Sequence, residues 1–131
     1  MSGKGQTSVS EMQEKVVRYF FNRPNNFPNG RPYNCCESVL LVLAEHLGIS
    51  SELIPKIGTS IGVGVGLNGL LCGSISSVAM AIGIKHGRNR AEENPQPAWN
   101  KNNKYVVSFK DKFGAVSSRQ LTGLNLRRLE D

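Results

Sequence analysis

The segment NCCESVLLVLAEHLG, residues 34–48, carries a helix signal at each of its ends. Asn34 is a preferred N-cap residue, and Glu37 stands three positions after it, as in a capping box. Gly48 is the residue type that most often ends a helix in the left-handed conformation. The segment therefore predicts a helix that begins immediately after Asn34 and ends before Gly48.

The two cysteines of this segment start the predicted helix but lie on different sides of it. Apolar side chains recur at helical spacing and form one stripe: Cys36, Leu40, Leu43 and Leu47, with Val39 beside it. Cys35 lies about 100° away from Cys36 around the helix axis. Free N–H groups and the helix dipole at a helix start stabilise a thiolate and lower its pKa. We therefore expect Cys35 to be the chemically active thiol and Cys36 to be a packed small hydrophobic side chain.

The glycine-rich run GVGVGLNG, residues 62–69, stands before the third cysteine, Cys72. Its alternation is compatible with a strand, but no partner strand is evident, and repeated glycines disfavour a helix. We expect a turn here, followed by a buried helix over residues 71–86 that Cys72 opens. Such a backbone can present N–H groups to an anion or a metal-bound sulfur. We therefore expect Gly69 and Gly73 to contribute to a cofactor site. The alternative is that Cys72 is a buried small residue without a chemical role.

The remaining patterns complete one domain over residues 1–131, an all-α fold that forms a compact bundle of about five helices. The glycine-rich turn precedes its central buried helix. Further helices are predicted over residues 9–21 after the cap Ser8, over residues 53–61 after Ser50 or Ser51, over residues 104–113 before Gly114, and as a single turn at residues 117–121. Residues 1–7 are expected to be disordered. Residues 88–103 are expected to form a polar loop whose Trp99 anchors either its own core or a partner.

The formal net charge of +6 is concentrated in the C-terminal third of the chain. Residues 1–84 contain six Lys and Arg against five Asp and Glu, whereas residues 85–131 contain ten against five. A basic region can attract an acidic partner or nucleic acid. Because no nucleic-acid recognition motif is present, nucleic acid is not expected as a partner, and a solvated basic surface is the simpler interpretation.

Residues 1–15 contain no apolar core of a secretory signal, so a cytoplasmic, thiol-reducing location is expected. Cysteines in that location are more often ligands or redox groups than disulfides. Residues 57–84 carry no charged side chain and are long enough to span a bilayer. The glycines between Gly58 and Gly73 oppose one continuous helix, so a membrane span is not expected.

No standard metal or nucleotide motif is present. The chain has no CxxC pair, the separation of its cysteines fits no zinc module, and its glycines form neither a phosphate-binding nor a dinucleotide-binding loop. His46 and His86 both fall near the ends of predicted helices. Each is a candidate base or ligand, but interaction with the helix dipole is the more common role there.

Three blocks of the chain together resemble the redox-active protein family named for its C-GCAxxG-C-C cysteine pattern. The blocks are NCCESVL at residues 34–40, the glycine-rich run leading into CGS at 72–74 and AMAIGIKHG at 79–87, and residues 109–123. The resemblance extends in order over residues 10–126. It implies an all-helical fold, four cysteines and a redox or iron–sulfur role.

The chain departs from the family pattern at its third cysteine. The resemblance places the first cysteine at Cys35, the second at Cys72 and the third at Ser118, and no cysteine follows Ser118 in this sequence. A serine hydroxyl is a poor substitute for a thiolate toward iron. One chain therefore cannot supply four thiolates from the family positions.

Two hypotheses remain, and whether the protein is an enzyme stays open. In the first, Cys35 and Cys72 form a reversible redox dithiol or bind a metal, with Cys36 as a third ligand or resolving thiol. A homodimer would then bring four cysteines to one iron–sulfur cluster. In the second, the chain is a non-catalytic family member that binds or assembles with an acidic partner through its basic C-terminal third and the segment around Trp99.

Overall fold

The structure of the protein, a computed structural model, describes residues 8–22, 24 and 29–125. Its elements are α1 (Val9–Phe21), α2 (Cys35–Leu47), the 3-10 helix η2 (Lys56–Gly58), α3 (Gly62–Gly66), α4 (Gly73–His86), α5 (Gln96–Phe113), α6 (Ser118–Thr122) and an isolated antiparallel bridge between Leu71 and Ser117. The predicted all-α class is confirmed for these residues. The expected disorder of residues 1–7 lies outside the described part of the chain.

Capping side chains fix the starts of α1 and α2, as predicted. The Ser8 hydroxyl oxygen accepts the Glu11 N–H at 3.0 Å, and α1 covers the predicted residues. The Asn34 side chain accepts the Glu37 N–H at 2.9 Å, while the Glu37 carboxylate accepts the Asn34 N–H at 3.0 Å. Gly48, with a φ of 70°, ends α2. Because the capping box is complete, α2 begins at Cys35, the residue directly after its cap.

The core of the molecule lies between α2 and α4. Its buried members are Cys36, Ser38, Leu40, Val42 and Ala44 from α2 and Gly73, Ile75, Ser77 and Ala81 from α4. Cys36 and Leu40 are buried as predicted, whereas Leu43 and Leu47 are only half-buried. The buried face of α2 is wider than one apolar stripe because α4 and α1 both pack against this helix.

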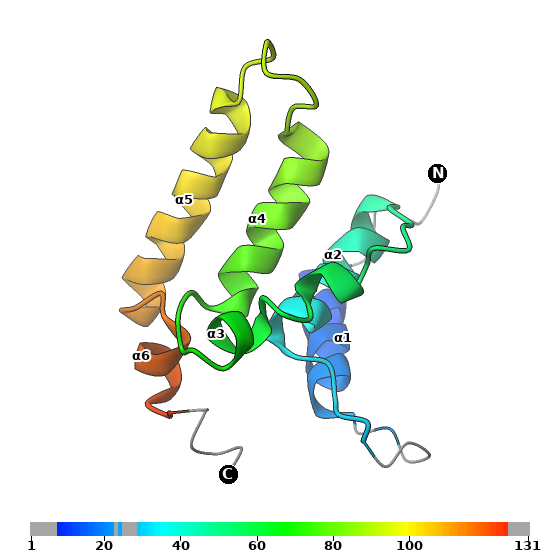
Figure 1. Cartoon of the computed structure of the whole chain (residues 1–131), viewed down its shortest axis with the longest axis vertical. Helices are drawn as coiled ribbons and strands as arrows, with labels where there is room; N and C mark the ends of the chain where they lie inside the picture. Colours follow the sequence, from blue (N-terminus) through cyan, green and yellow to red (C-terminus); the bar gives the residue numbers. More distant parts are fainter. Residues whose placement is uncertain (1–7, 23, 25–28, 126–131) are drawn as a thin grey trace.

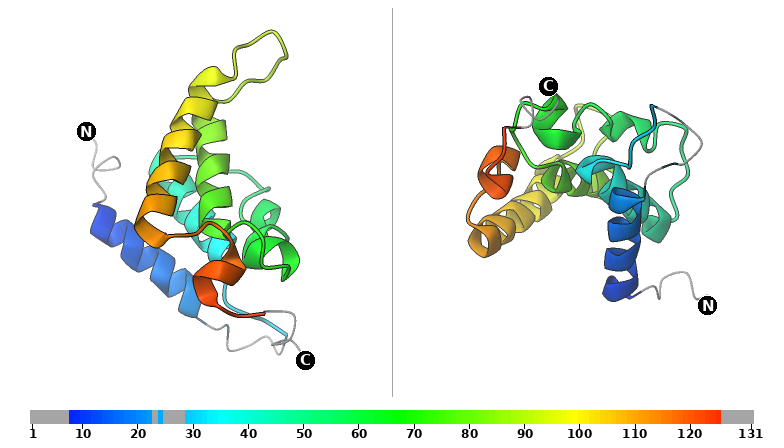
Figure 2. Two further views of the ribbon diagram at one scale, coloured as in Figure 1. Left: turned by 90° about the vertical axis from the view of Figure 1, so that its left-hand side faces the viewer. Right: turned by 90° about the horizontal axis from the view of Figure 1, so that it is seen from below.

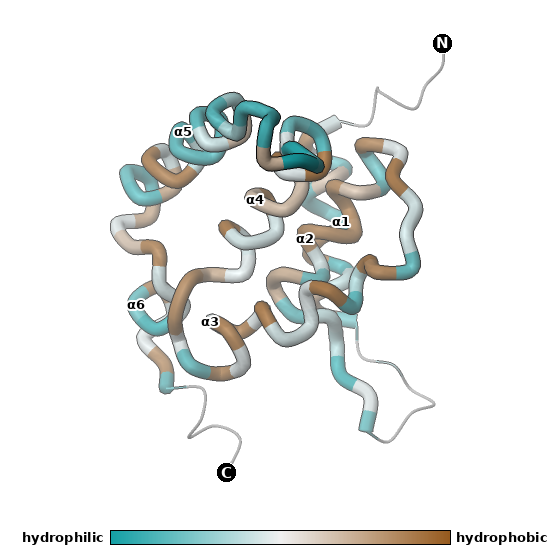
Figure 3. Tube along the Cα trace, turned by 45° about the horizontal axis from the view of Figure 1, so that its top comes forward, coloured by the Kyte–Doolittle hydropathy of each residue, from teal (hydrophilic) through white to brown (hydrophobic). Residues whose placement is uncertain are grey.

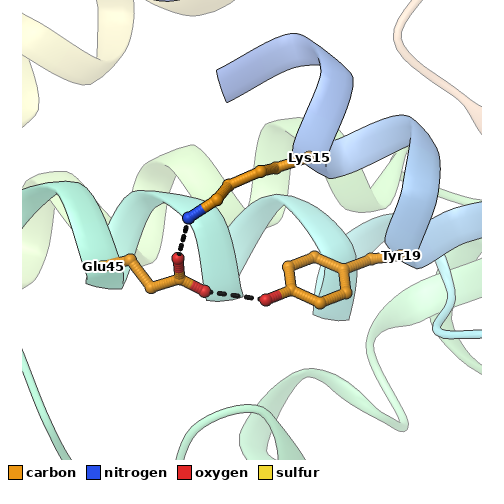
Figure 4. A network of polar contacts seen from close by, with 3 residues as sticks. All are labelled: Lys15, Tyr19 and Glu45. Atoms are coloured by element: carbon orange, nitrogen blue, oxygen red, sulfur yellow. Dashed lines mark hydrogen bonds and ion pairs between the residues drawn. The ribbon is translucent and has the colours of Figure 1, made fainter. Parts of the chain in front are cut away.

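α1 joins α2 through a polar contact at the edge of the core (Figure 4). The Lys15 ammonium lies 2.6 Å from one Glu45 carboxylate oxygen, and the Tyr19 hydroxyl donates to the other at 2.8 Å. The bond from Lys15, and then that from Tyr19, lower the pKa of Glu45. Because these groups are solvent-exposed, the contact orients α1 more than it stabilises the fold.

The helix predicted over residues 53–61 is wrong for most of its length. Turns occupy residues 52–55, and only the three residues of η2 are helical. Pro55 has no N–H to donate and disfavours a helical backbone in the residue before it. The apolar side chains around it therefore pack from turns rather than from a helix.

The polar loop is shorter than predicted, because α5 begins at Gln96 rather than near residue 104. Pro97 lies in the first turn of α5, where its fixed φ favours a helix start, and the Asn94 side chain accepts the Gln96 N–H at 3.0 Å. Trp99 consequently lies on a helix, with 61% of its surface exposed, so it does not anchor its own core. α5 ends at Phe113, before Gly114, as predicted.

Figure 1 shows α4 and α5 side by side, joined by the loop over residues 87–95, with α2 and α1 on the other side of α4. The short elements α3 and α6 lie together at the N-terminal end of α4 (Figures 1 and 2). Many residues of α2 are hydrophobic, whereas the α4–α5 loop and the start of α5 are hydrophilic (Figure 3). Within the described residues, no helix combines the length and the apolar character needed to cross a bilayer.

Candidate functional site

Two helix starts meet at the centre of the molecule, and each carries a cysteine. Cys35 is the first residue of α2, and Cys72 is the N-cap of α4. Their side chains are hydrogen-bonded to each other. A glycine makes this approach possible, because a Cβ atom at Gly73 would lie 2.5 Å from the Cys35 sulfur and 2.8 Å from the Cys36 nitrogen. Two cysteines that are far apart in the sequence are thus brought together, as the resemblance implied.

The glycine-rich run forms a left-handed turn against the first of these sulfurs. All five residues from 63 to 67 have positive φ, including 58° at Val63 and 63° at Val65. The turn is closed by a bond of 3.0 Å from the Val65 N–H to the Ile61 carbonyl. Positive φ is unfavourable for β-branched residues, so this turn holds local strain. Its orientation directs the Val63 N–H to the Cys35 sulfur.

Several donor groups near the Cys72 sulfur affect its ionisation. Its pKa is lowered to about 5, first by the hydrogen bond from the Cys35 thiol and then by the N–H groups of Ser74 and Ile75 and the Ser74 hydroxyl. Both N–H groups belong to the first turn of α4, and that of Ile75 also donates to the Cys72 carbonyl at 2.9 Å. The pair therefore loses its first proton more readily than an ordinary thiol does, and these donors favour the negative charge at Cys72.

Cys35 holds the proton of the pair. Its hydrogen bond to Cys72, followed by burial, raises the pKa of Cys35 above its ordinary value, although the N–H groups of Val63 and Gly73 act in the opposite direction. We predicted from the sequence that Cys35 would have the lowered pKa. The structure differs because two adjacent sulfurs cannot both ionise easily, and Cys72 has the larger set of donors.

Cys36 is a packing residue, as predicted. It is fully buried, with an exposed fraction of 0%, and a Cβ atom at Gly58 would lie 3.0 Å from its sulfur. Burial, followed by the charges of Glu37 and Cys72, raises the pKa of Cys36 to about 11. A buried, protonated thiol of this kind is a poor nucleophile. All three cysteines lie in the described part of the chain, and none of them forms a disulfide.

The two glycines assigned to a cofactor site have different positions. Gly73 donates its N–H to the Cys35 sulfur. Gly69 has a φ of 67° and accepts the Arg119 N–H at 3.1 Å, so it joins the turn to α6 rather than to the sulfurs. Among the described residues, no three His, Cys, Asp or Glu side chains gather in one place that could hold a metal ion. The structure thus does not bring Cys36 into a three-cysteine metal site.

Ser118, the third family position, lies on a segment that pairs with the residues before α4. The Ser118 N–H donates to the Leu70 carbonyl at 2.6 Å, and the Cys72 N–H donates to the Val116 carbonyl at 2.8 Å. Ser118 is buried, with an exposed fraction of 6%. The main chain therefore holds the third family position next to the segment that carries Cys72.

Sequence reasoning missed the groups that surround the sulfurs. Ser74 was detectable, because it lies two positions after the N-cap, where an N–H points toward the cap side chain. Val63 was not, because nothing in its residue type indicates positive φ. Tyr105 of α5 was missed as well; burial, and then the charge of Cys72, raise its pKa.

The two histidines lie away from the sulfurs. His46 is in the last turn of α2 and His86 in the last turn of α4, at the opposite ends of these helices from the cysteines. His46 lies eleven positions after Cys35 along α2, which corresponds to about 16 Å. Both line a small hollow between α2, α4 and α5 with Lys85 and Lys101. Neither histidine is placed to act on the cysteine pair.

Two hydrogen-bonded thiols at the adjoining starts of two core helices define a small all-α dithiol protein. The chain belongs to the family described as "Putative redox-active protein (C_GCAxxG_C_C)", whose family model matches residues 33–130. This confirms the resemblance found in the sequence, and the family description indicates a redox-active role. No curated protein and no solved structure matches the chain.

Proposed function

We propose that Cys35 and Cys72 form a two-electron dithiol–disulfide couple that exchanges with a disulfide in a partner molecule. The observation that carries the proposal is the hydrogen bond between the two sulfurs, which puts a thiolate beside the thiol with which it would pair. Both residues are partly exposed, whereas Cys36 is fully buried. This division gives the pair access to a partner and keeps the third cysteine out of the exchange.

The exchange begins at Cys72, the thiolate of the pair. Its sulfur attacks one sulfur of the partner disulfide, a mixed disulfide forms, and the departing partner thiolate takes a proton from water. Cys35 then loses its proton to water and attacks the Cys72 sulfur. The Cys35–Cys72 disulfide forms, and the second partner thiolate departs and is protonated. The protein pair has lost two electrons and the one proton that Cys35 held, and the partner disulfide has become two thiols, with the second proton supplied by water.

The surroundings of Cys35 support its second role. Once Cys72 is bound in a mixed disulfide, it no longer carries the charge that holds the proton on Cys35. The N–H groups of Val63 and Gly73 still donate to the Cys35 sulfur, so the pKa of Cys35 falls at that stage. The strained turn at α3 thus stabilises the thiolate that completes the exchange.

A chromogenic aromatic disulfide, dithiobis-nitrobenzoate, tests this sequence of steps. The reduced native protein is expected to release two equivalents of nitrothiobenzoate rapidly, because Cys35 displaces the mixed disulfide. Cys35→Ala should release one equivalent and remain as the mixed disulfide, and Cys72→Ala should react slowly. Cys36→Ala is the matched control and should behave like the native protein. Rapid release of two equivalents by Cys35→Ala would refute the assignment of roles.

An iron–sulfur cluster does not fit the sulfur ligands of one chain. A cluster takes four protein ligands, whereas the junction of α2 and α4 offers two sulfurs, Cys35 and Cys72. A homodimer would supply four. Anaerobic purification followed by iron and sulfide analysis separates the two cases: the dithiol couple predicts colourless, iron-free protein, and a bridging cluster predicts visible absorption from a dimer.

A second candidate function, docking of an acidic partner, is favoured by the exposure of Trp99 on α5. The same helix carries four lysines and one aspartate, Lys101, Lys104, Lys110, Lys112 and Asp111. An exposed aromatic residue next to basic side chains suits an acidic protein surface. Such binding should weaken as salt is added and should be lost in Trp99→Ala but unchanged in Cys35→Ala.

A further inference from the structure

A concave apolar hollow lies on the side of α4 opposite to α5, away from the cysteine pair. It has a volume of about 420 Å³ and is lined by Leu40 of α2, by the turns between residues 49 and 57, and by Met80, Gly83 and Ile84 of α4. Figure 1 shows these turns and α5 on different sides of α4. The floor is the core residue Leu40, which is 1% exposed. The hollow is therefore a recess that reaches the core.

The lining of the hollow selects for apolar ligands. Among the described residues that line it, Ser51 alone carries a polar side chain, and none is charged. Three apolar side chains at the rim are open to water. The exposed fraction is 55% at Leu53, 48% at Ile57 and 49% at Ile84. The Ser51 hydroxyl oxygen accepts the Leu53 N–H at 3.1 Å, which leaves its hydrogen available for one acceptor on a ligand.

Gly83 is an exposed residue of α4 that lines the hollow. It lies inside α4 with helical backbone, where glycine is less favourable than alanine. A Cβ atom at this position would meet nothing within 4 Å, so no neighbouring group of this chain requires a glycine here. A larger side chain at Gly83 can therefore extend over the hollow without a clash, whereas Gly73 in the same helix is needed for close packing.

We propose that this hollow binds a small, uncharged, apolar molecule, an aromatic ring system or a short hydrocarbon chain with at most one hydrogen-bond acceptor. Its volume is in the range of small-molecule sites, which are predominantly apolar with few polar groups. A charged ligand would leave its charge without a partner against this lining. The proposal is independent of the dithiol chemistry and adds a second site to the molecule.

The neutral fluorescent dye N-phenyl-1-naphthylamine tests the proposal on the purified full-length protein. We expect saturable binding at one site per chain. Gly83→Leu places a side chain over the hollow and should weaken binding by about tenfold or more. Ser108→Leu adds the same side chain to the exposed surface of α5 and should bind the dye like the native protein. Circular dichroism tests whether both variants fold. If Gly83→Leu does not fold, Gly83→Ala replaces it in the test; it adds one methyl group and should weaken binding to a smaller extent.

Three outcomes would overturn the proposal. The first is equal dye binding by the native protein and the Gly83 variants, and the second is binding that does not saturate. The third is a dimer in sedimentation velocity that dissociates in Gly83→Leu while the native protein binds no dye, since a second chain would then cover the hollow. None of these outcomes bears on the cysteine pair, whose test is the release of nitrothiobenzoate.

Discussion

The thiol of Cys35 donates a hydrogen bond to the sulfur of Cys72 across the junction of α2 and α4. The two sulfurs thus share one proton near neutral pH, and the negative charge resides on Cys72. The N–H groups of Ser74 and Ile75 stabilise the charge at Cys72, whereas those of Val63 and Gly73 act on the Cys35 sulfur. The reactivity of each thiol therefore depends on the presence of the other.

Alkylation should reveal the lowered pKa of Cys72 directly. The rate of its reaction with iodoacetamide, followed by peptide mass spectrometry, should rise with pH through a midpoint at about 5. Cys35→Ala removes the strongest donor and should move this midpoint toward the ordinary value of a thiol. Cys36→Ala serves as the control and should leave the midpoint in place. An unchanged midpoint in Cys35→Ala would contradict the shared-proton arrangement.

The pair should also make stability depend on pH. The folded pKa of Cys72, about 5, lies below its ordinary value of 9.0, so its contribution is complete above pH 9 and is lost as pH falls from 9 to 5. The pKa of Cys35 is raised above 9.0, so its contribution is lost as pH rises above 9. The free energy of unfolding of the native protein, measured by urea titration relative to a Cys35→Ala/Cys72→Ala double variant, should therefore rise from pH 5 to 9 and decrease beyond 9.

Two glycines of α4 should respond in opposite directions to the same substitution. Gly73→Ala would place a Cβ atom 2.5 Å from the Cys35 sulfur and 2.8 Å from a backbone nitrogen, and should destabilise the fold by about 1–3 kcal/mol. Gly83→Ala meets no atom within 4 Å and should stabilise it by about 1 kcal/mol. Thermal unfolding of the two variants tests both predictions. If Gly73→Ala stabilised the protein, the starts of α2 and α4 would have to be farther apart than described.

The left-handed turn should tolerate glycine better than a regular helix does. Val65 has a φ of 63° and an exposed fraction of 41%, so Val65→Gly should stabilise the protein by up to about 1 kcal/mol through relief of strain. Val107 is similarly exposed on α5, and Val107→Gly should destabilise it by about 0.5 kcal/mol. The free energy of unfolding of both variants is measured by urea titration. An equal loss of stability in the two would argue against positive φ at Val65.

Much of the fold was predictable because local signals determine it. Ser8 and Asn34 are strong caps, and Gly48 and Gly114 are strong stops, so α1, α2 and the end of α5 fall at the predicted residues. The start of α5 was missed because Gln96 and the asparagines after it give no apolar periodicity. Its helix signal is the single Pro97 in the first turn.

The candidate site was predictable only in part. Helix starts at Cys35 and Cys72 follow from the sequence, and the family resemblance selects the same two cysteines. Which of them carries the charge depends on donors from Val63 and Ser74, and therefore on tertiary contacts. The positive φ of Val63 has no signature in its residue type, because it is imposed by the packing of the turn between α2 and α6.

Disulfide mapping after mild oxidation is the most direct test of the dithiol couple. The reduced protein would be equilibrated with oxidised glutathione, its remaining thiols alkylated, and its peptides separated without reductant. The account predicts a Cys35–Cys72 disulfide that forms reversibly, in native protein and in Cys36→Ala alike, while Cys36 is recovered as a thiol. Recovery of Cys35 and Cys72 as free thiols, or a disulfide that contains Cys36, would contradict it.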